Sequence, residues 1–235
     1  MRSREPPRGD AVGVPVMTER AKVSTILGRA FTLLHFPRRA EHRMGMPALS
    51  EPTYWTAAMV RELPDDGNRY ECIDGELLVT PSPLNLHQAV VGELYRMLFP
   101  YVREMGIGYV QVSPLDVELD DGMIVQPDVL AFHLTPSVAQ GRIHGRDLLL
   151  TVEVLSPSTA RRDRGLKRAF YERIGVAEYW IVHPASRLVE RWRSGASAPV
   201  WEDGILGWQP VGATHPLMID LPALFDSVPE VFRTP

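Results

Sequence analysis

Two acidic residues stand inside apolar, strand-like segments. Asp128 belongs to IVQPDVLAF and Glu153 belongs to LLLTVEVL. An ionised carboxylate is costly to remove from water unless it is paired, hydrogen-bonded or bound to a cation. If the two segments form neighbouring strands, both carboxylates can converge on one ion, and oxygen ligands are those that Mg²⁺ or Mn²⁺ prefers. The alternative, in which they lie at strand ends and are solvated or paired with arginine, stays open.

Lysine is rare in this chain, since only Lys22 and Lys167 occur among 25 basic residues. Lys167 lies four residues after Asp163 and four before Tyr171, so the three share one face of a helix expected over residues 159–173. That helix directly follows the Glu153 strand. A compact ammonium group, which can reach a phosphate or give up a proton, differs chemically from a guanidinium. An exposed ion pair is the simplest alternative.

Arginines surround Lys167 on the same segment. A basic cluster beside a cation site suits a phosphodiester substrate, whereas a solvated basic face is the competing interpretation. The candidate contacts to nucleic acid are Arg161, Arg162, Arg164 and Arg168.

A second group of polar residues surrounds the expected turn at Asp74-Gly75. Glu71 and Glu76 flank this turn, and a two-residue loop would place both carboxylates on one face of a hairpin. We expect Glu76 to be an additional metal or water ligand, with Glu71 as the reserve. His87 opens the following helix, where a surface or hydrogen-bonded buried histidine is favoured over a catalytic one.

Periodicity and turn residues predict the elements that must position these side chains. A mixed central sheet flanked by helices is the economical packing for their order, an α/β (α+β) fold. The predicted elements are a hairpin over 69–80, a helix over 84–105, a second antiparallel pair over 109–119 and 123–132, a strand covered on both faces over 148–155, the helix over 159–173, strands over 178–183 and 187–193, and weaker strands with a short helix near 221–225.

Charge divides the chain into two parts. Residues 1–48 hold nine basic and four acidic residues, whereas the remainder holds 16 basic and 25 acidic ones. We expect 1–48 to be a disordered basic extension and 49–235 to be the folded domain. One cysteine, Cys72, fits a reducing compartment such as the cytoplasm, and no apolar run approaches the length of a membrane span.

Several motifs in order resemble the Uma-two family of endonucleases, a branch of the PD-(D/E)XK nuclease superfamily. They are RYECIDGEL, TPSPLNLHQ, QPDV and VEVLSPSTARRDRGLKRAFYERIGVAEYWIVHP. The resemblance covers about residues 50–195 and implies a restriction-endonuclease-like fold. It assigns the PDV aspartate to Asp128, the EVLSPS glutamate to Glu153 and a displaced lysine to Lys167. The chain departs from the pattern at Leu155, where the superfamily has lysine, and at His183, where the family commonly has an acidic residue.

The resemblance implies Mg²⁺-dependent hydrolysis of phosphodiester bonds in nucleic acid, with DNA as the expected substrate. Asp128 and Glu153, with Glu76 and the Val154 carbonyl, would hold Mg²⁺ or Mn²⁺, and Lys167 would orient or deprotonate the attacking water. A homodimer is compatible with this activity because one active centre cuts one strand. Two other functions stay open: a catalytically inactive nucleic-acid-binding module, and a hydrolase of smaller phosphoesters.

Overall fold

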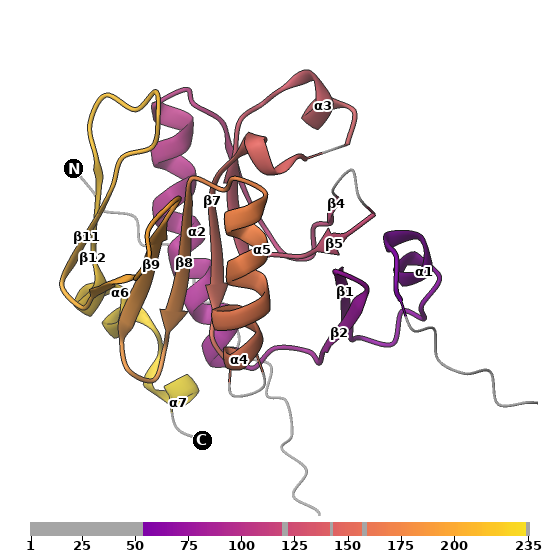
Figure 1. The fold of residues 1–235 in the computed structure, drawn as a ribbon. Helices are drawn as coiled ribbons and strands as arrows, with labels where there is room; N and C mark the ends of the chain where they lie inside the picture. The colour runs from indigo at the N-terminus through magenta and orange to yellow at the C-terminus, as the bar shows by residue number, and fades with distance from the viewer. Residues whose placement is uncertain (1–53, 119–121, 142, 157–158, 234–235) are drawn as a thin grey trace, which may run out of the picture. The chain divides into compact units, whose positions relative to one another are not determined.

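The computed structural model describes residues 54–118, 122–141, 143–156 and 159–233 (Figure 1). All of them belong to one compact unit, Ser50–Pro235. The predicted basic extension over 1–48 lies outside the described residues and stays a prediction. No helix of the described part is both long and apolar enough to cross a membrane.

Helices and short helical turns occur at both ends of the unit and between its strands. They are α1 (Ala57–Arg61), α2 (Asn85–Glu104), α3 (Pro136–Ala139), the 3-10 turn η1 (Gly145–Asp147), α4 (Ala160–Arg162), the π-helical turn η2 (Asp163–Lys167), α5 (Arg168–Arg173), α6 (Leu221–Ser227) and α7 (Glu230–Arg233).

The strands are mostly short. They are β1 (Arg69–Ile73), β2 (Glu76–Thr80), β3 (Tyr109–Val112), β4 (Val117–Glu118), β5 (Ile124–Val125), β6 (Val129–Phe132), β7 (Leu148–Val154), β8 (Glu178–His183), β9 (Leu188–Arg193), β10 (Val200–Glu202), β11 (Ile205–Trp208) and β12 (Leu217–Asp220).

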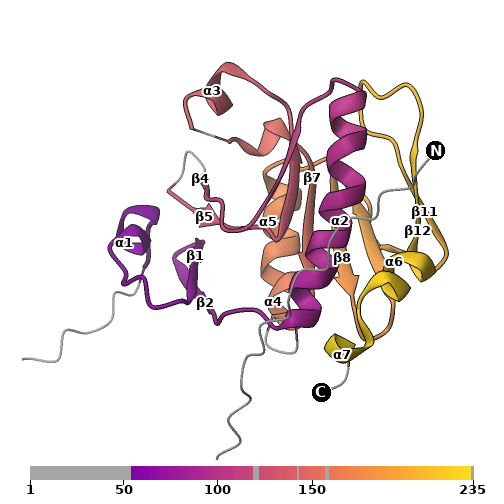
Figure 2. The same cartoon turned by 180° about the vertical axis from the view of Figure 1, so that it is seen from behind.

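The central sheet has the strand order β10-β9-β8-β7-β6-β3, in which only β7 and β8 run parallel. A second sheet has the order β2-β1-β5-β4, and β11 pairs with β12. The two views place α2 on one face of the central sheet and α4, η2 and α5 on the other (Figures 1 and 2). The prediction of a mixed sheet flanked by helices is therefore confirmed.

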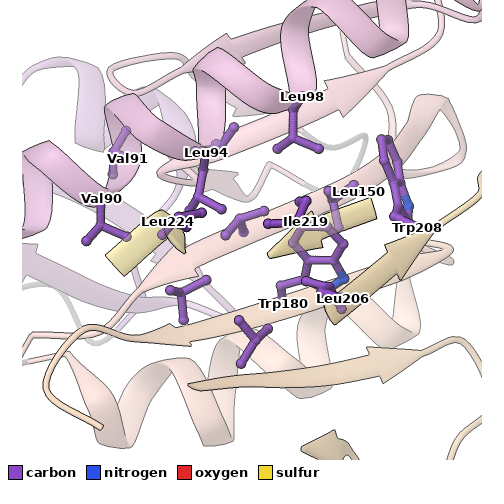
Figure 3. Packing of buried hydrophobic residues seen from close by; sticks show 14 of the residues in the cluster. Val90, Val91, Leu94, Leu98, Leu150, Trp180, Leu206, Trp208, Ile219 and Leu224 are labelled. Atoms are coloured by element: carbon purple, nitrogen blue, oxygen red, sulfur yellow. The ribbon is translucent and has the colours of Figure 1, made fainter. Parts of the chain in front are cut away.

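Apolar side chains cover both faces of the central sheet. On one face, α2 contributes Leu94 and Leu98, which pack with Leu150 and Trp180 of the sheet and with side chains of β11, β12 and α6 (Figure 3). On the other face, Phe170 and residues of the hairpin β1–β2 join a second cluster. Every residue of β7 is buried, as the continuous apolar run predicted. The central strand is therefore packed on both faces.

The first hairpin forms as predicted. Ile73 pairs with Glu76, and Asp74 and Gly75 both have positive φ (51° and 79°), as a two-residue turn of this kind requires. The second predicted pair is divided. Its outer parts, β3 and β6, join the central sheet, whereas β4 and β5 join the hairpin sheet. Pro114 interrupts this segment, and proline has no amide hydrogen for a strand ladder.

Candidate active site

Strand register brings the two predicted carboxylates together. In the antiparallel pair β6–β7, Val129 lies opposite Val152, so Asp128 precedes β6 at the level of Glu153. Glu153 belongs to the face of the sheet that carries η2 and α5, because it contacts Lys167 and Tyr171. The backbone amide of Val154 donates a hydrogen bond to Asp128 Oδ2 (2.8 Å). Asp128 is thus tied directly to the strand that carries Glu153.

Asp128 is buried, and both of its carboxylate oxygens accept hydrogen bonds. Its Oδ1 accepts a hydrogen bond from Arg69 Nη1 (2.8 Å), and its Oδ2 accepts one from His87 Nε2 (3.0 Å) as well as from the Val154 amide. Burial opposes ionisation, yet the hydrogen bond from His87 and the charge of Arg69 together hold the pKa of Asp128 well below its usual value. Asp128 is therefore an anion in this arrangement.

Lys167 lies between two other buried carboxylates. Its Nζ is 2.9 Å from Glu153 Oε1 and 2.9 Å from Glu71 Oε1. Tyr171 donates a hydrogen bond to Glu153 Oε1 (3.0 Å), and the Gln126 amide donates one to Glu71 Oε1 (2.8 Å). Burial lowers the pKa of Lys167, but the charges of Glu153 and Glu71 outweigh burial and raise it. Lys167 is consequently a protonated cation here.

Asp163 adds a fourth buried carboxylate. Only 1% of its surface is exposed, and neither side-chain oxygen forms a hydrogen bond with the described residues. Burial raises the pKa of Asp163 to about 6, although the charge of Lys167 partly offsets the effect. Burial likewise raises the pKa of Glu153, again against the charge of Lys167. These two groups hold protons more tightly than ordinary carboxyls do.

We call Glu71, Asp128, Glu153 and Asp163 the carboxylate cluster. When all four are ionised, they face two permanent cations, Arg69 and Lys167, and His87 adds a third positive charge at Asp128 when it is protonated. The cluster then carries two uncompensated negative charges when His87 is neutral and one when it is protonated, in a region of low water content. Such an excess is expensive unless protons or an external cation neutralise it.

A pocket of about 850 Å³ opens beside this cluster. Its wall includes Asp128, Arg69 and His87, together with Ser156 and Thr159 from the segment between β7 and α4. The other three carboxylates and Lys167 lie behind this wall, each less than 4% exposed. Asp128 is thus the member of the carboxylate cluster that reaches the pocket.

The structure places the two hairpin glutamates in different surroundings. Glu76 is exposed at the turn end of β2, away from the carboxylate cluster, whereas Glu71 is fully buried and contacts Lys167. Their shared face was predicted correctly, because Ile73 pairs with Glu76. Alternation fixes the face of a strand, but it does not show which end of that face the rest of the chain covers, so the preference for Glu76 over Glu71 could not be based on burial.

The four predicted nucleic-acid contacts do not line the pocket. Arg162 donates to the Val79 carbonyl (2.9 Å), and Arg164 bonds to Glu190 and His183. Arg168 pairs with Glu172 and lies 4.0 Å over the ring of Trp192. Arg161 is exposed. Three of the four are therefore engaged in contacts within the protein, on the helix surface rather than at Asp128.

Two residues belong to the site although the sequence did not point to a role there. The sequence favoured either a surface histidine or a hydrogen-bonded buried histidine for His87. The structure shows the second, and the hydrogen-bond partner is Asp128. Arg69 was assigned only to a strand, yet it pairs with Asp128. Side chains two residues apart on a strand lie on the same face, so Arg69, Glu71 and Ile73 share one face of β1. Strand alternation could therefore have indicated that Arg69 lies on the same face as Glu71.

The donor set suits a divalent cation, although the present arrangement is filled by internal cations. Within the described ranges, no three histidine, cysteine or acidic side chains are grouped as a metal site. Lys167 lies between Glu71 and Glu153, and Arg69 covers Asp128. Glu71 Oε2, however, is buried without a hydrogen-bond partner among these residues. Oxygen donors, an unpartnered carboxylate oxygen and excess negative charge all fit Mg²⁺ or Mn²⁺.

Comparison with known proteins identifies the family. No curated protein matches the chain. A solved structure described as "a putative nuclease belonging to DUF820" from Anabaena variabilis ATCC 29413 superposes with a TM-score of 0.61 at 20% identity, covering 73% of this chain and 98% of that one. This likeness shows a nuclease-like fold. A family model described as "Uma2: Putative restriction endonuclease" matches residues 57–220. Because that match spans most of the chain, the chain belongs to the Uma2 family of nucleases.

Proposed function

We propose that this chain is a metal-dependent endonuclease of the PD-(D/E)XK type that hydrolyses phosphodiester bonds, with DNA as its substrate. The supporting observation is the carboxylate cluster, whose four buried acidic groups outnumber the basic side chains that face them, Arg69, Lys167 and His87, beside an 850 Å³ pocket. A purely structural ion-pair network would need no excess of negative charge, because an excess costs stability.

Asp128, Glu153 and Glu71 are the residues that we expect to hold the metal. Bound there, Mg²⁺ or Mn²⁺ would polarise the phosphoryl oxygen and make a water molecule more nucleophilic. Glu71 takes the place that the sequence assigned to Glu76, because only Glu71 is buried beside Glu153 and Lys167. His87 and the Val154 amide keep the Asp128 carboxylate in a fixed orientation.

Lys167 supplies positive charge. The charges of Glu153 and Glu71 raise its pKa, so in this arrangement it donates hydrogen bonds and does not accept a proton. Such a donor can orient a water molecule and stabilise the charge that develops on a phosphate. Tyr171 holds Glu153 from the same helical segment, so the lysine and its partner are positioned together.

The test is a cleavage assay on the full chain with duplex DNA, single-stranded DNA, RNA and a small chromogenic phosphodiester. Each substrate is incubated with EDTA, Mg²⁺ or Mn²⁺. We expect cleavage of nucleic acid only with a divalent cation, and a loss of about 100-fold or more in Asp128→Asn and Glu153→Gln. Circular dichroism verifies that both variants fold.

Glu76→Gln is the matched control, because Glu76 is an exposed carboxylate of the same hairpin. It should cleave like the wild type. Undiminished cleavage in both site variants, or equal cleavage in EDTA, would refute the proposal. Salt-sensitive binding without turnover would instead support an inactive binding module, and turnover of the small diester alone would support a hydrolase of smaller phosphoesters.

A further inference from the structure

Arg69 connects the pocket with the buried carboxylates. Its side chain is 17% exposed and lines the pocket, while its guanidinium bonds to Asp128. Burial disfavours the charge of Arg69, yet the charges of Asp128, Glu153 and Glu71 raise its pKa. Arg69 therefore stands at the boundary between the space open to a substrate and the carboxylate cluster behind it.

The hydrogen-bonding capacity of Arg69 is only partly used. A guanidinium has five N–H donors in a planar fork. Both hydrogen bonds that it makes with described residues pass through Nη1, to Asp128 Oδ1 (2.8 Å) and Ser113 Oγ (3.2 Å). Its Nε is buried without a partner among those residues. Spare donors arranged as a fork are suited to two oxygens of a phosphate group.

We propose that Arg69 is an exchangeable cation: it neutralises Asp128 while no metal is bound, and it turns to a substrate phosphate when a divalent cation takes that carboxylate. This inference rests on the proposed nuclease function. It assigns Arg69 two successive partners, the Asp128 carboxylate and a phosphate in the pocket, and it couples metal binding to substrate binding.

The exchange follows from competition for one oxygen. A metal ligated by Asp128 needs a lone pair of Oδ1 or Oδ2, and Oδ2 already accepts two hydrogen bonds from His87 and the Val154 amide. Oδ1 is the less occupied oxygen, and Arg69 lies on it. A cation that binds only when Arg69 has moved must overcome the Arg69–Asp128 pair, so the pair lowers the apparent metal affinity.

Two binding measurements on the full chain test the exchange without relying on catalysis. Titration calorimetry of metal-free protein with Mn²⁺ should give binding that is about five-fold tighter, or more, in Arg69→Gln than in the wild type. Fluorescence anisotropy with a hydrolysis-resistant phosphorothioate oligonucleotide measures how far Mn²⁺ improves nucleic-acid binding. This metal-dependent gain should be about ten-fold smaller in Arg69→Gln, because the released guanidinium is missing.

Arg96→Gln is the matched control. Arg96 also pairs with a carboxylate, Glu93, but it lies on the exposed surface of α2 and does not line the pocket. Its variant should keep both the wild-type Mn²⁺ affinity and the wild-type gain. Arg69→Lys, which keeps the charge without the fork, should retain the Mn²⁺ affinity of the wild type but lose part of the gain. Thermal melting of each variant verifies the fold.

Unchanged or weaker Mn²⁺ binding in Arg69→Gln would overturn the exchange, since it would make Arg69 a mere support for Asp128. A full metal-dependent gain in that variant would overturn it as well. The outcome for the nuclease function is distinguishable from the outcome for the exchange. If Arg69→Gln shows both binding changes but the wild type hydrolyses no substrate, the exchange is supported and the nuclease function is contradicted. A wild type that hydrolyses DNA, with neither effect in Arg69→Gln, removes the exchange alone.

Discussion

Acidic side chains within one cluster acquire opposite properties from their surroundings. Asp128 accepts three hydrogen bonds, including one from Arg69, and its pKa is held low. The Asp163 oxygens have no hydrogen-bond partner among the described residues, and burial raises its pKa to about 6. The cluster thus contains one carboxylate that stays ionised, Asp128, and at least one carboxyl, Asp163, that binds a proton in the weakly acidic range. Groups of this kind are common at functional sites.

Asp163 should make the protein lose stability as the pH rises. A carboxyl whose pKa is raised in the folded state binds more protons there than in the unfolded state, so the free energy of unfolding falls between the unfolded and the folded pKa. For Asp163 this window runs from 3.8 to about 6. One pKa unit corresponds to about 1.4 kcal/mol, so the loss is up to about 3 kcal/mol.

Urea denaturation at a series of pH values measures this effect. The decrease in unfolding free energy between pH 4 and pH 6.5 should be shallower, by about 1 to 3 kcal/mol, in Asp163→Asn than in the wild type. A constant cost of burying the amide shifts the whole curve but leaves its slope unchanged. Asp203→Asn, in an exposed turn, is the control and should keep the wild-type slope. Equal slopes in the wild type and Asp163→Asn would contradict the prediction.

At the scale of elements, β1 supplies more of the site than its length suggests. It carries Arg69 and Glu71 two residues apart, so both lie on one face, and its turn with β2 fixes that face. A register slip by one residue would direct both side chains to the other face. The Asp74-Gly75 turn therefore positions two members of the candidate site.

Gly75 should tolerate no side chain. Its φ is +79°, and an added Cβ would meet the ring of Tyr54, with the nearest atom at 2.2 Å. Gly75→Ala should lower the free energy of unfolding by about 1 to 2 kcal/mol. Gly92→Ala is a matched control inside α2, where a Cβ meets nothing within 4 Å. It should stabilise the protein by up to about 1 kcal/mol. Urea denaturation compares the two, and equal effects would contradict the prediction.

The sequence predicted elements better than their tertiary partners. Local periodicity revealed α2, β7 and β8, because each buries a regular pattern of its own side chains. It could not reveal that 109–119 and 123–132 divide between two sheets, since that depends on pairing with β1 and β7. The short α1 and α3 carry too few residues for a periodic signal and were not predicted.

The same limit applies to the residues of the candidate site. Asp128, Glu153 and Lys167 could be proposed because each is an unusual residue for its place in the sequence, and the structure places Lys167 on Glu153 with Asp128 alongside. The sequence could not show that Glu71 and Arg69 belong to the candidate site, because the elements that cover one face of their strand lie far along the chain. The nucleic-acid contacts expected of the arginines over 161–168 stay a prediction, and the sequence could not show their partners within the protein, such as Glu190 and Trp192, because these come from β9.

Across the whole molecule, negative charge is in excess, and a part of this excess lies in the interior. Residues 49–235 carry 25 acidic and 16 basic residues, and the carboxylate cluster places part of that excess in the interior. If the proposed function holds, protons and divalent cations are alternative ways of neutralising the cluster. The stability of the protein should depend on both, because any ligand that binds only the folded state stabilises it.

Mn²⁺ should accordingly stabilise the protein more at pH 7.5 than at pH 5. With Mn²⁺ at about 100 times its dissociation constant, the gain is about 2.7 kcal/mol, or roughly 5 to 10 °C in the thermal midpoint of a domain of this size. At pH 5 the shift should be smaller, because Asp163, with a pKa of about 6, is mostly protonated and the cluster lacks the charge that attracts the ion. Glu153→Gln should lose most of the shift at pH 7.5, whereas Glu76→Gln should keep it, with potassium chloride used to match the ionic strength throughout. A shift of the same size at both pH values, or in both variants, would show that Mn²⁺ acts elsewhere on the acidic surface and that the carboxylate cluster is not the site of divalent-cation binding.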